Sequence, residues 1–359
     1  MKDKKLYVYF GIGTGVILVL IIIIFLINLL VGGIVSYTKA EEKMKEAAIK
    51  YFDKHTDRLP SLNNEVTINM DELVKEGYIK NFDRLLKNKE ASCSGTVTVK
   101  NNNNFYLYSS YLDCGKDYQT SYLYQKIIND NPVVTSSDGL YSINDELVFR
   151  GENINNYISF ANKLWRIIKI NNDNSIRMIE VKRDNSYVWD NRYNSSVGST
   201  NGINDYRVSR IKDSIEEIYQ NKDEFSDIEK SYIVAQNICL DARDEDDGIN
   251  YTCTNILENQ YVSLLNTDEY MIASIDSGCA KLSDRQCSNY NYMANFDRSF
   301  WTITANSLRS DRVFRIYQTP DTTYASNNGS IQLVVHISNK AMYAGGNGTE
   351  ENPYTIKMA

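Results

Sequence analysis

Trp165-Arg-Ile-Ile-Lys-Ile170 and Ile176-Arg-Met-Ile-Glu-Val181 are two alternating or near-continuous apolar runs on either side of the polar stretch 171–175. Runs of this length that are separated by turn residues predict a β-hairpin. From there to Ala359 the chain continues as short apolar or aromatic segments between Asn, Ser, Gly and Asp turns. We therefore expect residues 139–359 to form one larger β-rich domain, because a single β domain can reach this length.

One amphipathic helix is expected inside this domain, with its start near Asn204 or Asp205. Its apolar residues recur at helical spacing and are Val208, Ile211, Ile215, Ile218 and Tyr219. The fold class predicted for the chain is therefore α+β.

A polar, turn-rich stretch from Asn129-Asp130-Asn131-Pro132 to Ser137-Asp138-Gly139 precedes the larger domain. Asn, Asp, Gly and Pro at this density mark loops and turns. The sequence therefore predicts a linker over residues 129–138 and a separate, smaller module over residues 37–128.

The smaller module is expected to begin with a helix, because apolar residues recur at helical spacing through residues 39–53. This helix should end before Leu59-Pro60, since proline disfavours helix at the residue before it. A second, short helix is predicted between Asn69, which stands at an N-cap position, and Gly77.

Two strands complete the smaller module. Residues 93–100 and 105–112 are rich in Thr, Val and Tyr and flank the turn 101–104. This pattern predicts a second β-hairpin.

An uncharged stretch covers residues 6–37, and its centre, residues 16–30, is almost entirely Ile, Leu, Val and Phe. A bilayer core requires about 20 apolar residues, so the stretch predicts a transmembrane helix over residues 6–36. We expect this helix to continue into the amphipathic helix that follows. The alternative is a cleaved secretory signal, for which Thr38 and Ala40 form a small-x-small cleavage site.

Lys2, Lys4 and Lys5 precede the apolar stretch, and the positive-inside rule places residues 1–5 in the cytoplasm. The expected location is the cell membrane, with a single pass and an extracytoplasmic C-terminal region, so that the lipid bilayer is a partner through residues 6–36. The formal net charge of −7 argues against nucleic acid as a partner, because nucleic-acid binding depends on basic surfaces.

Six cysteines, an even number, are expected to be oxidised in that compartment. Their order favours three local pairs, namely Cys93 with Cys114, Cys239 with Cys253, and Cys279 with Cys287. A zinc site is the alternative, but no Cys-x-x-Cys occurs and the two histidines, His55 and His336, are isolated in the sequence.

The first part of the chain resembles a type IV pilin or pseudopilin. The resemblance rests on the apolar helix, its amphipathic continuation, Tyr51-Phe52 ahead of Leu59-Pro60, and the small disulfide-bonded sheet. It covers about residues 6–120 and implies a helical stalk that carries a small sheet.

The larger domain resembles a domain of uncharacterised function that is common in surface proteins of low-GC Gram-positive bacteria. It is also similar, more distantly, to bacterial domains with a C-type-lectin-like fold. The segments that carry the resemblance are Leu164-Trp-Arg-Ile-Ile-Lys-Ile, Ser263-Leu-Leu-Asn-Thr-Asp-Glu-Tyr, Cys287-Ser-Asn-Tyr-Asn-Tyr-Met, Phe300-Trp-Thr-Ile-Thr, Arg312-Val-Phe-Arg-Ile and Gly345-Gly-Asn-Gly-Thr-Glu-Glu-Asn-Pro-Tyr.

Asp241-Ala-Arg-Asp-Glu-Asp-Asp-Gly248 is the densest acidic run, and calcium favours clustered carboxylates. The candidate ligands are Asp241, Asp244, Asp246 and Asp247. Arg243 occupies the first position that the helix-loop-helix calcium pattern requires, so a solvated loop is the favoured interpretation. We expect no cofactor.

Common enzyme signatures are missing from the sequence, which has no Gly-x-Ser-x-Gly, no His-Glu-x-x-His and no phosphate-binding loop. His336 lies in the apolar run 331–337, where a histidine is more often a hydrogen-bonded structural residue than a general base. We therefore expect no catalytic residues.

Aromatic and amide residues follow the expected Cys279 to Cys287 loop. They are Asn289, Tyr290, Asn291 and Tyr292. Aromatic rings beside amides suit stacking on sugars or packing against another protein. We expect these residues to form a recognition surface within residues 288–298, whereas core packing is the favoured interpretation for Trp301.

The sequence thus predicts a non-catalytic binding or adhesion protein that is anchored at the cell surface and has a surface glycan or a protein as its ligand. Two alternatives stay open. One is a pseudopilin-like structural component of an envelope assembly, and the other is an unrecognised envelope hydrolase.

Overall fold

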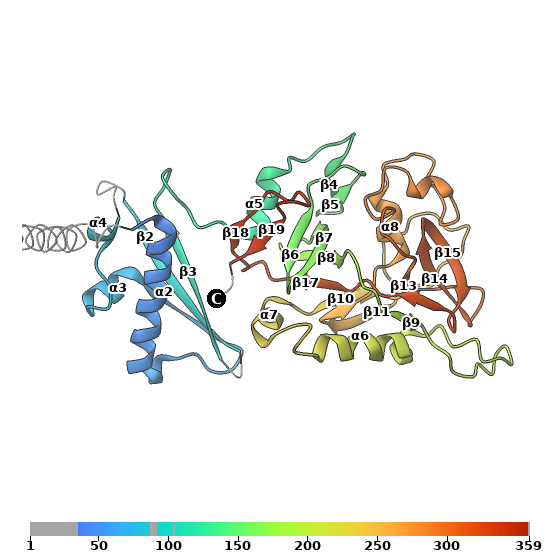
Figure 1. Ribbon diagram of the computed structural model, residues 1–359, viewed down its shortest axis with the longest axis horizontal. Coiled ribbons are helices and arrows are strands. Elements are labelled where there is room, and N and C mark those ends of the chain that lie inside the picture. The colour runs from blue at the N-terminus through green and yellow to red at the C-terminus, as the bar shows by residue number, and fades with distance from the viewer. Residues whose placement is uncertain (1–34, 87–91, 103–104, 358–359) are drawn as a thin grey trace, which may run out of the picture. The chain divides into compact units, whose positions relative to one another are not determined.

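The computed structural model describes residues 35–86, 92–102 and 105–357 (Figure 1). The chain divides into two compact units between Thr120 and Ser121. This boundary precedes the predicted linker 129–138, because Leu123–Asp130 form a helix, α5, that belongs to the second unit. The amide of Leu123 donates a hydrogen bond to the carbonyl of Ala341, at 2.8 Å.

In the first unit, one helix packs on a small sheet. Helix α2 (Tyr37–Lys54) lies against an antiparallel sheet of three strands, β1 (Glu65–Asn69), β2 (Ser94–Asn101) and β3 (Tyr106–Asp113). The short elements are η1 (Thr56–Arg58), α3 (Met70–Lys75) and α4 (Phe82–Leu85). The predicted hairpin and the predicted short helix are confirmed.

Glycine allows the helix to approach the sheet. A Cβ atom at Gly95, in β2, would lie 2.5 Å from Cε of Met44 in α2 and 2.9 Å from Cζ of Phe82. Because real Cβ contacts are longer than this, a larger residue at position 95 would displace the core side chains.

The first helix differs from its prediction at its start. It begins at Tyr37, because the Oγ atom of Ser36 accepts a hydrogen bond from the amide of Lys39 and Val35 pairs with Leu86 in a β-bridge. The predicted continuation from an upstream helix is therefore wrong. The helix ends at Lys54, before Leu59-Pro60, as predicted.

The predicted transmembrane helix requires a correction. Residues 1–34, which hold nearly all of the predicted span 6–36 and the predicted cytoplasmic tail 1–5, lie outside the described residues. Within the described ranges, no helix has the length and the apolar character that crossing a membrane requires. The fold class with a transmembrane helix and the single-pass membrane location are therefore wrong for the part of the chain that the structure describes.

The second unit contains a mixed sheet of nine strands. Its main path runs β12-β17-β8-β7-β6-β19-β18, while β4 and β5 attach through β7, and only β6 and β19 pair in parallel. The strands are β4 (Gly139–Ile143), β5 (Glu146–Arg150), β6 (Tyr157–Phe160), β7 (Lys163–Ile170), β8 (Ile176–Glu180), β12 (Val262–Ser263), β17 (Val334–Ile337), β18 (Tyr343–Gly345) and β19 (Tyr354–Ile356). Strands β7 and β8 form the hairpin that the sequence predicts, with Ile170 opposite Ile176.

A second sheet of the same unit has five strands in the order β15-β14-β13-β16-β9. They are β9 (Ser186–Val188), β13 (Phe300–Ala305), β14 (Arg312–Tyr317), β15 (Thr319–Tyr324) and β16 (Asn328–Ser330), and a separate pair is formed by β10 (Gln236–Cys239) and β11 (Ile256–Gln260). Trp301 of β13 is fully buried and donates from Nε1 to the carbonyl of Tyr187. Core packing, the interpretation that the sequence favours for Trp301, is therefore confirmed.

Short helices complete the second unit, and they are α6 (Arg210–Gln220), α7 (Asp227–Tyr232), α8 (Thr267–Ala273), η2 (Tyr206–Val208) and η3 (Arg285–Ser288). The predicted start of α6 near Asn204 or Asp205 is wrong. Ser209 caps α6 by accepting from the amide of Lys212, while the side chain of Asp205 caps η2 instead. Two capping residues therefore divide one helical pattern into two elements.

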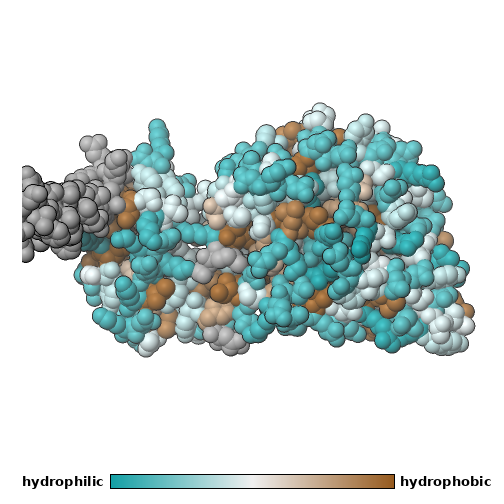
Figure 2. All heavy atoms as spheres, viewed as in Figure 1, coloured by the Kyte–Doolittle hydropathy of each residue, from teal (hydrophilic) through white to brown (hydrophobic). Residues whose placement is uncertain are grey.

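The face of the molecule shown in Figure 2 is hydrophilic over most of its surface, with hydrophobic residues in small scattered groups. Scattered exposed apolar residues are ordinary on protein surfaces and indicate no docking face by themselves. The hollows of the surface are therefore the candidate binding sites.

Candidate functional site

Three disulfides join Cys93 to Cys114, Cys239 to Cys253, and Cys279 to Cys287. This is the predicted pairing, and it is confirmed. The first bridge closes the open end of the β2–β3 hairpin, and the third closes the short loop that precedes the predicted recognition segment.

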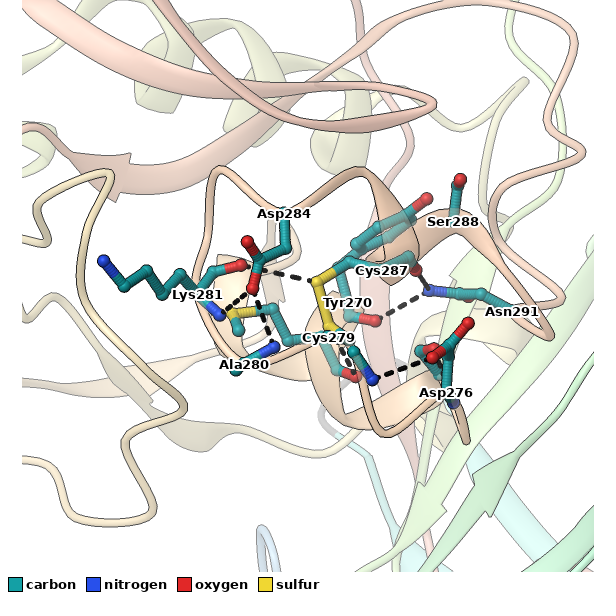
Figure 3. The surroundings of a disulfide bond; sticks show 12 residues. Tyr270, Asp276, Cys279, Ala280, Lys281, Asp284, Cys287, Ser288 and Asn291 are labelled. Atoms are coloured by element: carbon teal, nitrogen blue, oxygen red, sulfur yellow. Dashed lines mark hydrogen bonds between the residues drawn. A yellow bond between two sulfur atoms is a disulfide. The ribbon is translucent and has the colours of Figure 1, made fainter.

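Hydrogen bonds order the loop between Cys279 and Cys287 (Figure 3). One carboxylate oxygen of Asp284 accepts from the amides of Ala280 and Lys281, at 2.9 and 2.7 Å. The side-chain amide of Asn291 donates to the carbonyls of Tyr270 and Cys287, at 2.8 and 2.9 Å. The loop is thus tied to helix α8, which carries Tyr270, and forms a fixed support for the residues that follow it.

Two of the four predicted recognition residues are buried. Asn291 and Tyr292 are each only 1% exposed, and Tyr292 packs its ring 4.8 Å from the guanidinium of Arg166. Burial raises the pKa of the Tyr292 hydroxyl. The placement of these two residues on a recognition surface is therefore wrong, because the bridge between Asn291 and Gly151 draws this part of the segment into the core.

The other two residues do lie at the surface. Tyr290 is 55% exposed and has a positive φ of 48°. Asn289 is exposed as well, and its side-chain amide donates to the carboxylate of Asp276, at 2.7 Å. Tyr290 therefore offers an open ring, whereas Asn289 is engaged in ordering the loop.

The residues that follow Tyr292 in the sequence line part of a hollow of about 310 Å³. Residues 293–300 line one side, and residues 316–318, at the turn between β14 and β15, line the other. Met293, Phe300 and Ile316 are buried, while Tyr317 is 64% exposed. The hollow thus combines buried apolar side chains with one open aromatic ring.

Polar side chains also line this hollow, and they are Asn295, Asp297, Arg298 and Gln318. Arg298 donates to the carbonyl of Asp184 at 2.9 Å, and Asn295 donates to Glu152 at 3.3 Å. Among the described residues, the side-chain amide of the exposed Gln318 has no hydrogen-bond partner. The hollow is therefore bordered by amide, carboxylate and guanidinium groups, of which Asp297 also pairs with Lys182 at 3.7 Å.

Sequence reasoning reached one side of this hollow, residues 293–298, and missed Tyr317 and Gln318. The only sequence signal for these two is their position at the end of an alternating strand, shortly before Pro320. Their pairing with residues 293–300 arises from contacts between segments that are distant in sequence.

The four candidate calcium ligands do not converge. Asp241 accepts from Thr254 and Asn255, Asp247 accepts from the amide of Asp244, and Asp246 pairs with Lys281 at 3.0 Å. Among the described residues, the one group of three potential metal ligands is Cys239, Asp241 and Cys253. Both of its sulfur atoms are in a disulfide, whereas metal binding requires a thiolate.

His336 is buried in β17 beside an ion pair. Both carboxylate oxygens of Glu269 accept from Arg177, at 2.5 and 2.8 Å, and Nη1 of Arg177 lies 3.2 Å from Nε2 of His336. Burial, together with the charges of Arg177 and Lys169, lowers the pKa of His336 well below its usual value. The neutral ring accepts a hydrogen bond from Arg177, which is the structural role that the sequence predicts.

Comparison with known proteins assigns no role to these residues. The resemblances to pilins and to the Gram-positive surface domain, and the roles that they imply, stay predictions. No protein-family model, no curated protein and no solved structure matches the chain.

Proposed function

We propose that the second unit is a non-catalytic binding module that recognises a saccharide at the hollow lined by residues 293–300 and 316–318. The observation that carries this proposal is the exposed ring of Tyr317, 64% accessible, beside a hollow bordered by amide, carboxylate and guanidinium groups. An aromatic face with polar neighbours suits a ligand that has both C–H and hydroxyl groups.

The ring of Tyr317 and the polar side chains near it would contact different parts of a sugar. The face of Tyr317 would pack against the C–H face of a sugar ring, while Asn295, Asp297 and Gln318 would exchange hydrogen bonds with its hydroxyls. A volume of about 310 Å³ is at the lower end of the range for small-ligand sites. The hollow therefore suits one sugar ring of a longer chain better than an extended ligand.

Preorganisation supports this role. The hydroxyl of Tyr270 donates to the carbonyl of Gln318 and so holds the turn next to Tyr317. The hydrogen bonds of Asn291 to the carbonyls of Tyr270 and Cys287 order the segment that leads to the other side of the hollow. Side chains that are fixed before binding lose less entropy when a ligand arrives, which strengthens a small contact.

The non-catalytic part of the proposal rests on His336. This residue is the one that the sequence singles out for comparison with a general base, yet it is buried and hydrogen-bonded to Arg177. Its burial leaves it no access to a ligand at the surface. The three disulfides suit a protein that works in an oxidising environment.

A glycan array probed with the purified chain tests the proposal. Tyr317→Ala should abolish retention of the bound glycan while leaving the melting temperature unchanged. Tyr193→Ala is the matched control, because Tyr193 is 62% exposed and does not line the hollow. An array without any bound glycan, or equal binding by both variants and the parent, would contradict saccharide recognition at this site.

A further inference from the structure

A larger hollow of the second unit, of about 670 Å³, has no role in the proposed saccharide site and shares no lining residue with it. Four segments line this cavity, and they are residues 196–197, residues 204–207, the β10–β11 connection at Leu240, Ala242 and Asn255, and residues 303–310 apart from Thr304. The volume lies in the middle of the range for small-molecule sites.

Hydrogen bonds fix the loop of residues 306–310 at the cavity. The side-chain amide of Asn204 lies 2.9 Å from each of the carbonyls of Asn306, Arg309 and Arg312. The Oδ1 atom of Asn306 accepts from the amides of Leu308 and Arg309, at 3.0 and 2.8 Å. This wall of the cavity is therefore built in advance of any ligand.

Two polar groups at the cavity lack hydrogen-bond partners among the described residues, and one of them, the Tyr206 hydroxyl, is itself buried. Asn306 is 7% exposed, and among the described residues nothing accepts a hydrogen bond from its Nδ2 atom. Tyr206 is 3% exposed, and its hydroxyl also has no hydrogen-bond partner within the described ranges. Native proteins satisfy most buried polar groups, so the buried Tyr206 hydroxyl, together with the unpaired Nδ2 donor of Asn306, favours a ligand at this cavity.

The charged residues at the cavity are Arg207, Arg309 and Asp205, so cations outnumber anions there, although the chain as a whole carries −7. Arg207 donates from Nη2 to the side-chain oxygen of Asn255 at 2.6 Å, and Arg309 pairs with Asp311 at 3.2 Å. Each guanidinium has five N–H donors, so both retain donors for a ligand.

The remaining lining is apolar. It consists of Val197, Leu240, Ala242, Ile303, Ala305 and Leu308. Leu308 is 71% exposed, so its side chain is open to contact. The cavity thus presents hydrogen-bond donors and positive charge next to apolar surface.

From these features we propose that the cavity binds an apolar amino-acid residue with a free α-carboxylate, as found at the C-terminus of a peptide or in an N-acylated amino acid. The carboxylate accepts from the Nδ2 atom of Asn306 and from the arginines, because charge-assisted hydrogen bonds to a carboxylate are the strongest that these donors form. The apolar side chain packs against Leu308 and the other aliphatic residues of the lining.

The test measures calorimetric binding of N-acetyl-leucine to the full chain, with N-acetyl-leucine amide as the uncharged match. We expect the acid to bind at least tenfold more tightly than the amide, a difference of about 1.4 kcal/mol. A pentapeptide that ends in leucine, as the free acid and as the amide, distinguishes a peptide terminus from a small molecule. Equal binding of acid and amide, or no binding of either acid, would overturn the proposal.

Asn306→Asp is the informative variant. It keeps the Oδ1 acceptor that holds Leu308 and Arg309 and replaces the unpartnered donor with a negative charge, so the loop should fold while the acid is repelled. Affinity for the acid should fall at least tenfold, with circular dichroism unchanged. Leu308→Ser is the second variant, because this exposed residue has no folding role to lose; unaltered affinity in both variants would also overturn the proposal.

Discussion

The hydroxyl of Tyr270, in helix α8, donates a hydrogen bond to the main-chain carbonyl of Gln318, at the turn between β14 and β15. Gln318 itself has a positive φ of 63°, a conformation that few residues other than glycine adopt without cost. A contact between residues 48 positions apart therefore supports a turn that presents the exposed ring of Tyr317.

Loss of this hydrogen bond should destabilise the second unit. Tyr270→Phe removes the donor and leaves a main-chain carbonyl unpaired, so we expect the free energy of unfolding to fall by about 1 kcal/mol. The control is Tyr206→Phe, which removes a hydroxyl that has no partner within the described residues and should leave stability unchanged or slightly raised. Urea titration of both variants measures the difference, and equal losses would refute this assignment.

Neighbouring tyrosines should respond differently to truncation. Tyr292→Ala removes a ring that is 1% exposed and should cost about 3–5 kcal/mol, as other large buried side chains do. Tyr290→Ala removes a ring that is 55% exposed and should change stability by no more than about 0.5 kcal/mol. Thermal unfolding of the two single variants separates them; similar melting temperatures would show that Tyr292 is not a core residue.

Stability should decrease on acidification because of His336 and Glu269. The folded-state pKa of His336 is lowered by burial and by Arg177 and Lys169, so below about pH 6.5 the unfolded chain binds a proton that the folded chain does not. Burial opposes ionisation of Glu269, but the charge and hydrogen bonds of Arg177 outweigh it and lower that pKa. Its contribution is complete above the unfolded-state pKa and is lost as the pH falls through the folded-state value.

The pH profile of the unfolding free energy tests whether stability falls on acidification as predicted. Between about pH 6.5 and 5 the parent should lose stability steadily, whereas His336→Gln should be flatter over this interval because its side chain does not titrate. Both proteins should lose stability at lower pH as Glu269 and other carboxylates protonate. A variant with the same slope as the parent above pH 5 would show that His336 does not contribute.

The third disulfide should stabilise the chain more than it shapes it. Replacement of Cys279 and Cys287 by serine releases a loop with a sequence separation of 8 residues, and the chain-entropy model then predicts a loss of about 2–3 kcal/mol. The hydrogen bonds of Asn291 and Asp284 remain in the variant, so the loop should refold to the same conformation. Urea titration gives the loss, and a stability equal to that of the parent would contradict this prediction.

Local patterns in the sequence determined the elements whose partners are near in the chain. The β7–β8 hairpin, the β2–β3 hairpin and the three disulfides join residues separated by short segments, so spacing and periodicity were enough to predict them. Capping decided finer boundaries, and Ser36 and Ser209 began helices where periodicity alone extended them further.

Only the tertiary structure decided which side chains are accessible. Residues 289–292 show no regular alternation of apolar and polar side chains from which their burial could be predicted. The β-bridge between Asn291 and Gly151 buries Asn291 and Tyr292, while Tyr290 stays exposed. The hollow beside Tyr317 and the cavity at Asn306 each combine segments from different strands and loops. Their geometry depends on long-range packing, which carries no periodic signal in the sequence, because the residues that meet are set by how whole strands and loops assemble.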